Sequence, residues 1–207
     1  MNVPPLCPVS PFAGLPATTG GADGLIATER DGLGIACLTA RNGQSAALER
    51  LFHARFGIDL PGGPRRVRGH GVAAAGIAPE SWLITCEDAA DACAQSLRSA
   101  LGGRGSVVDL SDAYAMLRLS GPKVRDSLAR LVPLDLHERR FAPGAVAQTV
   151  VAHMSVTLWR LEEAERAAPV FEICVARSLA HSLYGVIRDS ALEFGFGFEP
   201  APHAPLA

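Results

Sequence analysis

One succession of strand and helix patterns occurs twice along this chain of 207 residues. Apolar residues at alternating or helical spacing predict the same order of elements in each block. The first block predicts strands over 34–40, 70–76 and 81–86, with helices over 44–56 and 88–101. The second predicts strands over 114–119, 147–153, 156–160 and 170–175, with helices over 124–131 and 178–194. We therefore expect an α+β protein built from duplicated β-α-β-β-α halves.

Matching positions in the two blocks support the duplication. The offset between Cys37 and Arg118 is 81 residues. It is 83 residues between His70 and His153, so the drift is small and falls within loops. Residue identity between the halves is low, and the shared order of elements carries the argument. The best-defined helix is the last one, whose apolar stripe comprises Leu179, Leu183, Val186, Ile187, Ala191 and Phe194.

Composition and pattern together divide the chain into four segments. Residues 1–22, rich in Pro, Gly, Ala and Thr, predict an irregular N-terminal arm that is ordered only against a partner. Residues 23–104 are expected to form the first α+β half, and residues 105–197 the second. Residues 198–207 contain three prolines and predict a Pro-rich C-terminal tail.

The composition excludes several classes of protein. The 19 Lys and Arg residues against 21 Asp and Glu leave no basic surplus for a nucleic acid. No apolar run approaches the ~20 residues that cross a bilayer. Prolines interrupt the start of the chain, where a secretory signal needs an apolar core. We therefore expect a cytoplasmic protein with no nucleic-acid or membrane partner. Its five irregularly spaced cysteines are expected to be reduced thiols: Cys7, Cys37, Cys86, Cys93 and Cys174.

The motif search predicts no catalytic, cofactor-binding or metal-ligating residue. His70, His153 and His181 are far apart in sequence, and His137-Glu138 lacks a second histidine one helical turn later. Two short glycine pairs, over 32–34 and 195–197, lack the context of a dinucleotide loop, and the second is expected to end a helix.

Three further motifs have an ordinary structural interpretation. Ser120-Gly-Pro-Lys123 matches S-x-x-K, with Ser111-Asp112 nearby, but the other elements of a serine acyl-enzyme are missing. Ser120 is therefore expected to cap the following helix. Gly43-Gln-Ser45 falls one glycine short of a nucleophile elbow. The basic run Arg65-Arg66-Val-Arg68 suits phosphates or carboxylates on a partner, although a solvated loop is favoured.

Four segments of the second block resemble the gamma subunit of heterotetrameric sarcosine oxidases. They are Leu117–Lys123, Pro133–His137, Phe141–Gly144 with Gln148-Thr149, and Arg177-Ser178 leading to Glu193–Gly195. The resemblance implies a fold like the folate-binding domain of glycine-cleavage aminomethyltransferase. It also implies a non-catalytic accessory subunit that binds no cofactor alone. The implied partners are alpha, beta and delta subunits, which carry FAD, FMN, NAD and tetrahydrofolate. The implied complex oxidises sarcosine to glycine, passes the methyl carbon to tetrahydrofolate and produces hydrogen peroxide.

Two alternatives stay open. A stand-alone folate-binding one-carbon protein would need a carboxylate for the pterin, and Asp109, Asp112 and Glu172 are the candidates. The equivalent subunit of a sister enzyme acting on N-methylglutamate or a methylated proline would look the same, because substrate contacts lie on other chains. An accessory subunit also predicts an exposed apolar patch near the N-terminal arm or the 194–198 end.

Overall fold

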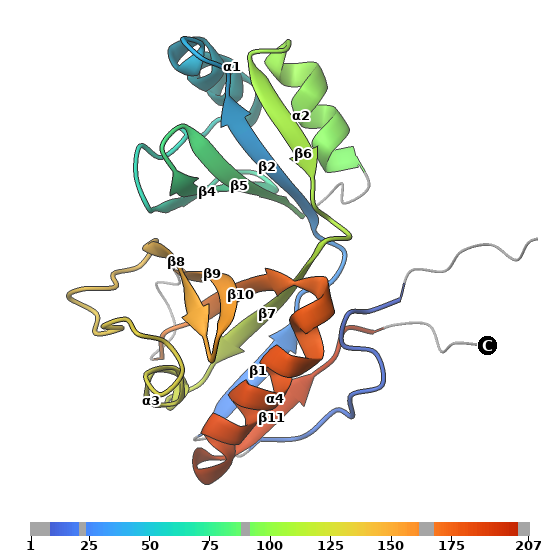
Figure 1. Ribbon diagram of the computed structural model, residues 1–207, viewed down its shortest axis with the longest axis vertical. Helices are drawn as coiled ribbons and strands as arrows, with labels where there is room; N and C mark the ends of the chain where they lie inside the picture. Colours follow the sequence, from blue (N-terminus) through green and yellow to red (C-terminus); the bar gives the residue numbers. More distant parts are fainter. Residues whose placement is uncertain (1–8, 21–23, 88–91, 162–167, 203–207) are drawn as a thin grey trace, which may run out of the picture.

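The computed structural model describes residues 9–20, 24–87, 92–161 and 168–202, which form two β-sheets with helices outside them (Figure 1). The first sheet has the order β3-β4-β5-β2-β6. Its strands are β2 (Gly34–Ala40), β3 (Arg66–Arg68), β4 (Val72–Ala78), β5 (Ser81–Cys86) and β6 (Gly105–Asp109). The second sheet has the order β11-β1-β7-β10-β9-β8. Its strands are β1 (Leu25–Glu29), β7 (Tyr114–Ser120), β8 (Val146–Val151), β9 (Met154–Arg160), β10 (Phe171–Ala176) and β11 (Phe196–Glu199).

The duplication is visible in the strand order. In each sheet a strand and a helix are followed by three strands, a helix and a last strand: β2-α1-β3-β4-β5-α2-β6 and β7-α3-β8-β9-β10-α4-β11. The spatial order β3-β4-β5-β2 corresponds to β8-β9-β10-β7. The helices are α1 (Ser45–Phe56), α2 (Cys93–Leu101), α3 (Val124–Leu128) and α4 (Ala180–Ala191). The α+β class is confirmed, and each repeated unit contains more strands than the expected β-α-β-β-α succession.

One strand breaks the symmetry of the two halves. β1 lies between β7 and β11, pairing antiparallel with β7 and parallel with β11. β1 falls in the segment expected to be the first half, and β6 in the segment expected to be the second, yet each lies in the other half's sheet. The division between the sheets therefore does not coincide with the 23–104 and 105–197 boundaries. Residues Phe198 and Glu199, expected in the tail, end strand β11.

The layers follow from the alternation of side chains along each strand. In β7, Ala115, Leu117 and Leu119 face a core under α3 and α4, whereas Met116 faces the other sheet. A separate core lies between the first sheet and helices α1 and α2. The protein is thus a four-layer sandwich of helices, sheet, sheet and helices (Figure 1). The core between the sheets comprises Ile35, Ala75, Leu83, Met116, Val146, Trp159, Leu161, Val170 and Cys174.

The helix ends agree with the sequence expectation at α1 and differ from it at the start of α3. α1 ends as predicted, at Gly57, whose φ of 70° is the left-handed conformation that glycine adopts without strain. Ser120 is no helix cap, because it ends β7 and α3 begins at Val124 with no side-chain cap. The chain first turns at Gly121, whose φ is 113°. The proposed cap of α2, Asp88, lies outside the described residues.

The N-terminal arm packs against its own chain. Phe12 is 1% exposed and its ring lies 6.2 Å from that of Phe198. Thr18 and Phe198 exchange two backbone hydrogen bonds of 3.0 and 2.8 Å. The Ser10 hydroxyl donates to Glu29 at 2.5 Å. For residues 9–20, the expectation of order only against a partner is wrong.

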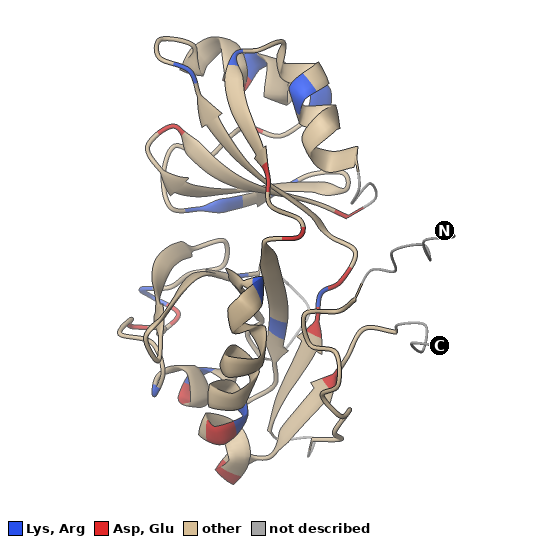
Figure 2. Ribbon diagram, turned by 45° about the vertical axis from the view of Figure 1, so that its right-hand side comes forward, with Lys and Arg blue, Asp and Glu red and all other residues tan. Residues whose placement is uncertain are grey.

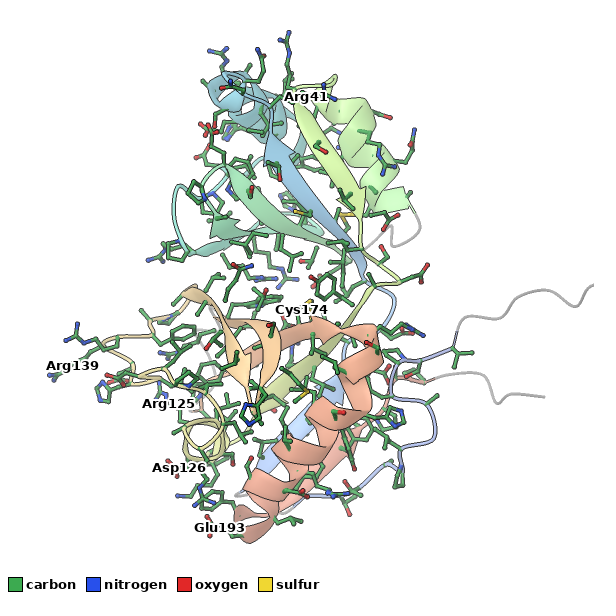
Figure 3. All side chains as sticks on the ribbon, in the orientation of Figure 1. Arg41, Arg125, Asp126, Arg139, Cys174 and Glu193 are labelled. Carbon is green, nitrogen blue, oxygen red and sulfur yellow. A yellow bond between two sulfur atoms is a disulfide. The ribbon has the colours of Figure 1, made fainter. Side chains whose placement is uncertain are left out.

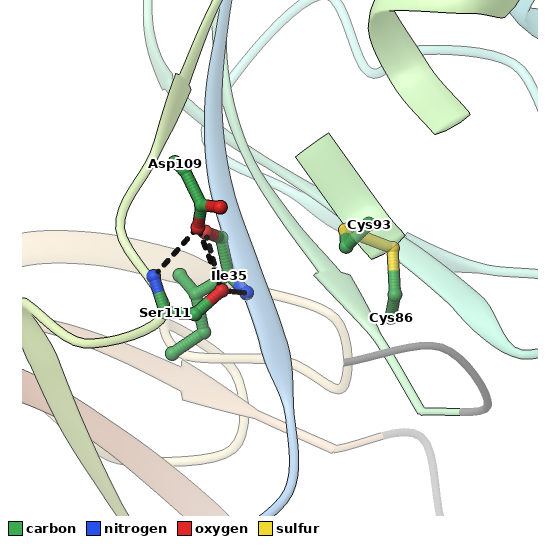
Figure 4. Close-up of a disulfide and its surroundings, with 5 residues drawn as sticks. All are labelled: Ile35, Cys86, Cys93, Asp109 and Ser111. Atoms are coloured by element: carbon green, nitrogen blue, oxygen red, sulfur yellow. Dashed lines mark hydrogen bonds between the residues drawn. A yellow bond between two sulfur atoms is a disulfide. The ribbon is translucent and has the colours of Figure 1, made fainter. Parts of the chain in front are cut away.

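The cysteines also differ from the expectation. Cys86, at the end of β5, and Cys93, at the start of α2, form a disulfide with Cα atoms 5.9 Å apart (Figure 4). Cys37 and Cys174 carry free thiols. The prediction of reduced thiols throughout is therefore wrong, because the fold brings together two cysteines that the count could not pair.

The end at residues 194–198, where an apolar patch is expected, is partly apolar at the surface: Phe194 and Phe196 are half-buried, and the neighbouring Leu192 is 62% exposed. Phe198 is buried, and Lys123 Nζ and Arg130 Cζ lie over the Phe194 ring at 5.3 and 4.9 Å from its centroid. Within the described part of the chain, no helix is long and apolar enough to cross a membrane.

The arm provides a first prediction. Replacing Phe12 by Ala should lower the free energy of unfolding by about 3–5 kcal/mol, because it empties a buried aromatic site. Val9→Ala, at a side chain that is 46% exposed, is the control and should change it by less than about 0.5 kcal/mol. Urea unfolding of the full chain measures both, and equal effects would contradict the packing of the arm.

Candidate functional site: the charged junction between the sheets

A buried carboxylate lies where the two sheets meet. Glu172, on β10, is 2% exposed and faces Arg118 of β7 and Trp159 of β9 in the strand register. Its Oε1 accepts from Arg118 Nε at 3.1 Å and Nη2 at 2.9 Å. Its Oε2 accepts from Trp159 Nε1 at 2.8 Å. Arg30 Nε adds an ion pair at 3.2 Å from Oε1. Donors thus occupy both oxygens of the carboxylate.

The ion pairs continue from the second sheet into the first. Arg30 follows β1, and its Nη2 lies 3.1 Å from Oε1 of Glu87, which follows β5. The other oxygen of Glu87 is 2.8 Å from Arg68 Nη2 on β3. Basic and acidic residues lie on both sides of the junction in Figure 2. A chain of alternating charges therefore connects one sheet to the other.

A fourth guanidinium completes the junction. Arg66, on β3, lies over the Trp159 ring with its Cζ 5.8 Å from the centroid. Its backbone N–H donates to Gly144 O at 2.7 Å, and the Val146 N–H donates to Pro64 O at 2.9 Å. These bonds tie β3 to the start of β8. Burial lowers the pKa of Arg66, and Glu172 opposes that shift.

This cluster, Arg30, Arg66, Arg68, Glu87, Arg118, Trp159 and Glu172, is called the charged junction below. Sequence reasoning singled out only Arg66, Arg68 and Glu172. The missed signal is a charged residue at an inward position of an apolar strand, as at Arg118 between Leu117 and Leu119. A buried charge requires a partner of opposite charge. Once β7 and β10 are known to pair, an ion pair between Arg118 and Glu172 can therefore be predicted.

The three carboxylates considered for a pterin have different surroundings. Glu172 is occupied by Arg118, Arg30 and Trp159. Asp109 accepts from the Ser111 N–H at 3.1 Å and the Ser111 hydroxyl at 2.8 Å, and these bonds lower its pKa (Figure 4). The Ser111 hydroxyl also accepts from the Ile35 N–H at 3.0 Å. This bond ties the segment that leads from β6 in the first sheet to β7 in the second to strand β2. Asp112 is exposed.

The remaining motif residues lie apart from the junction. Lys123 Nζ pairs with Asp126 Oδ2 at 2.9 Å instead of bonding Ser120. The Ser45 hydroxyl donates to Glu49 Oε1 at 3.3 Å on the surface of α1. Among the residues that the structure describes, no three His, Cys, Asp or Glu side chains form a group able to hold a metal ion.

A shallow hollow of about 460 Å³ lies on the inward face of the second sheet. Its lining residues are Tyr114, Gln148, Thr149, Val150, Ser155, Val156, Thr157 and Cys174. Cys174 lies between the two halves in Figure 3, and burial raises its pKa to about 12. Burial also raises the pKa of Tyr114, with Cys174 and Cys37 contributing. At neutral pH both groups are protonated, so the hollow offers hydroxyl, amide and thiol groups but no nucleophile.

Glu172 provides a prediction about stability. Glu172→Gln removes the buried charge that compensates the half-buried guanidinium groups of Arg30 and Arg118, and should lower the free energy of unfolding by about 3 kcal/mol. Glu87→Gln should lower it by less than about 1 kcal/mol, because its side chain is 32% exposed. Urea unfolding distinguishes the two variants, and an equal loss would contradict the central place of Glu172.

Cys174 provides a prediction about reactivity. With a pKa of about 12, only about one in ten thousand of these thiols is ionised at pH 8, and the thiolate is the reactive form. In the native protein, iodoacetamide should label the partly exposed Cys37 well before Cys174. The Cys174 rate should rise with pH until the pH approaches 12. Peptide mass spectrometry follows both sites, and unfolded protein, in which both label quickly, is the control.

The sequence of this chain is similar to a known protein family. The model of the sarcosine oxidase gamma subunit family matches residues 41–193. Sarcosine oxidase subunit gamma of Corynebacterium sp. strain U-96 is 32% identical over 134 residues, covering 63% of this chain and 62% of that protein. The subunit from an Arthrobacter species is 35% identical over 113 residues, covering 53% of this chain and 55% of that protein. These matches therefore span less than two thirds of the relatives' own length.

Solved structures extend the likeness to almost the whole chain. A chain of the heterotetrameric sarcosine oxidase from Corynebacterium sp. U-96, in complex with pyrrole 2-carboxylate, superposes with a TM-score of 0.76 at 27% identity. The match covers 97% of this chain and 99% of that chain. Glycine cleavage system aminomethyltransferase T from Bartonella henselae has a TM-score of 0.63 at 12% identity, covering 86% of this chain and 48% of that one, which shows a shared fold. Because the family model spans well over half of the sequence, the chain belongs to the sarcosine oxidase gamma subunit family.

Proposed function

We propose that this chain is the gamma subunit of a heterotetrameric sarcosine oxidase and acts as a non-catalytic accessory subunit. The observation that carries the proposal is the match over 97% of this chain to 99% of a chain within such an enzyme. The proposed partners are the alpha, beta and delta subunits. FAD, FMN, NAD and tetrahydrofolate are proposed to reside on those subunits, and the complex to work in the cytoplasm.

The chemistry proposed for the complex is oxidation of sarcosine to glycine. The methyl carbon passes to tetrahydrofolate and electrons pass to oxygen, giving hydrogen peroxide. Two features support an accessory role for this chain: Glu172 of the charged junction is occupied by internal donors, and burial keeps the Cys174 thiol in the hollow protonated. Neither group is free to accept a proton from a substrate or to attack one.

A stand-alone folate-binding one-carbon protein is the second candidate, favoured by the fold shared with aminomethyltransferase T. The occupied state of Glu172 and Asp109 weighs against it, since a pterin would have to displace internal donors. The gamma subunit of a sister enzyme acting on another N-methyl amine would share every feature described for this chain.

Co-expression tests the proposal. With alpha, beta and delta subunits of the same genome, the chain should co-purify in equal stoichiometry, and the complex should show flavin absorbance and sarcosine-dependent peroxide production. The chain alone should show no flavin absorbance and no heat of tetrahydrofolate binding, with an aminomethyltransferase as the positive control. Micromolar tetrahydrofolate binding by the isolated chain would overturn the accessory role in favour of the folate protein. N-methylglutamate turnover without sarcosine turnover would favour the sister enzyme.

A further inference from the structure

Arg66 points inward from an edge strand with little freedom to move. In the register of the first sheet it lies opposite Ala75, whose methyl group leaves room on the inward face. The bond from its backbone N–H to Gly144 O holds the strand against the start of β8. The Trp159 ring beneath the guanidinium is 1% exposed and is itself fixed by its bond to Glu172. Backbone and ring together hold the guanidinium at the junction.

The charges of the junction do not balance. Four guanidinium groups, on Arg30, Arg66, Arg68 and Arg118, face two carboxylates, on Glu87 and Glu172. Both carboxylates are already used: Glu172 by Arg118, Arg30 and Trp159, and Glu87 by Arg30 and Arg68. The junction therefore carries two more positive than negative charges.

Arg66 is the member that this imbalance leaves without an acceptor. Within the described residues its guanidinium makes no hydrogen bond and no ion pair. Its Cζ lies over the face of the Trp159 ring, 5.8 Å from the centroid. Half-buried, it has lost part of its hydration, and that loss lowers its pKa. A guanidinium offers five N–H donors in a planar fork that matches a carboxylate, and a stacked ring leaves the edge of that fork open.

We propose that Arg66 is the receptor for one carboxylate group that enters the junction from outside the chain. The group could be carried by a small molecule or by an acidic side chain of a partner subunit. Both sources present the same chemistry, a planar anion that accepts two parallel N–H bonds from Arg66. The second source rests on the proposed function, whereas the first does not.

Acetate is the probe for a small-molecule source. Titrated into the isolated full chain against chloride at constant ionic strength, it should give a saturable change in tryptophan fluorescence, because Trp159 lies under the site. Arg66→Met should weaken the binding about tenfold or more, the loss expected for a charge-assisted pair. Arg66→Lys keeps the charge but loses the fork, and should give an intermediate affinity.

Arg41→Met is the matched control. It removes one positive charge at the far end of the first half, away from the junction (Figure 3), and should bind acetate as the unmodified chain does. Circular dichroism and the urea midpoint establish that each variant is folded. Equal weakening by Arg66→Met and Arg41→Met would overturn the proposal, because the effect would then be one of net charge.

The co-expressed complex tests the partner source. If a partner's acidic side chain occupies the site, acetate should bind the isolated chain but not the co-expressed complex, and the Arg66→Met complex should dissociate at a lower salt concentration than the Arg41→Met complex. That result supports the site with a protein ligand, and a saturable acetate signal that persists in the complex supports it with a free one. Absence of both overturns the proposal while leaving co-purification, and with it the proposed function, intact.

Discussion

Burial of Glu172 between the two sheets is the constraint around which the structure is arranged. A carboxylate removed from water is costly unless charged and polar donors replace its hydration, and here two guanidinium groups and an indole N–H do so. These donors come from three different strands or strand ends, so they meet only when β7, β9 and β10 are paired and β1 has been added. The apolar residues around them could pack in many relative positions of the two sheets. The buried carboxylate is compatible with very few of these positions, because displacing a strand removes its donors.

The junction is asymmetric because the two halves depart from their pseudo-symmetry at one strand. The strands β3-β4-β5-β2 and β8-β9-β10-β7 correspond, but only the second sheet receives an additional strand from the N-terminus. Arg30 is placed at the junction because it follows that added strand. The first sheet contributes its charges from β3 and from the end of β5. The cluster is therefore a product of the departure from symmetry, which a duplicated sequence pattern could not reveal.

Much of the fold could be predicted from local patterns, and each failure has its own physical cause. β2 and β5 have the bounds predicted from alternation, and α1 those predicted from helical spacing to within one residue. β1 and β11 were missed because each is short and is stabilised by pairing across the chain, as between Leu25 and Phe196. The disulfide of Cys86 and Cys93, which are 7 residues apart, was missed for a different reason, since a count of cysteines carries no distances. Ser120 was misread as a cap because a strand end and a helix start share the same residue preferences.

The position of β1 has a consequence for how the chain is made. Residues 34–109 contain every strand of the first sheet, so that layer can be completed while the second half is still being synthesised. Among the described strands, the second sheet includes both the earliest and the latest in chain order. Its N-terminal strand must remain unpaired until β7 has emerged, and its edge is closed only when Phe196–Glu199 is released. The strand of this sheet that is made first therefore waits longest for its partners, and during that interval an apolar strand is exposed to pairing with other chains.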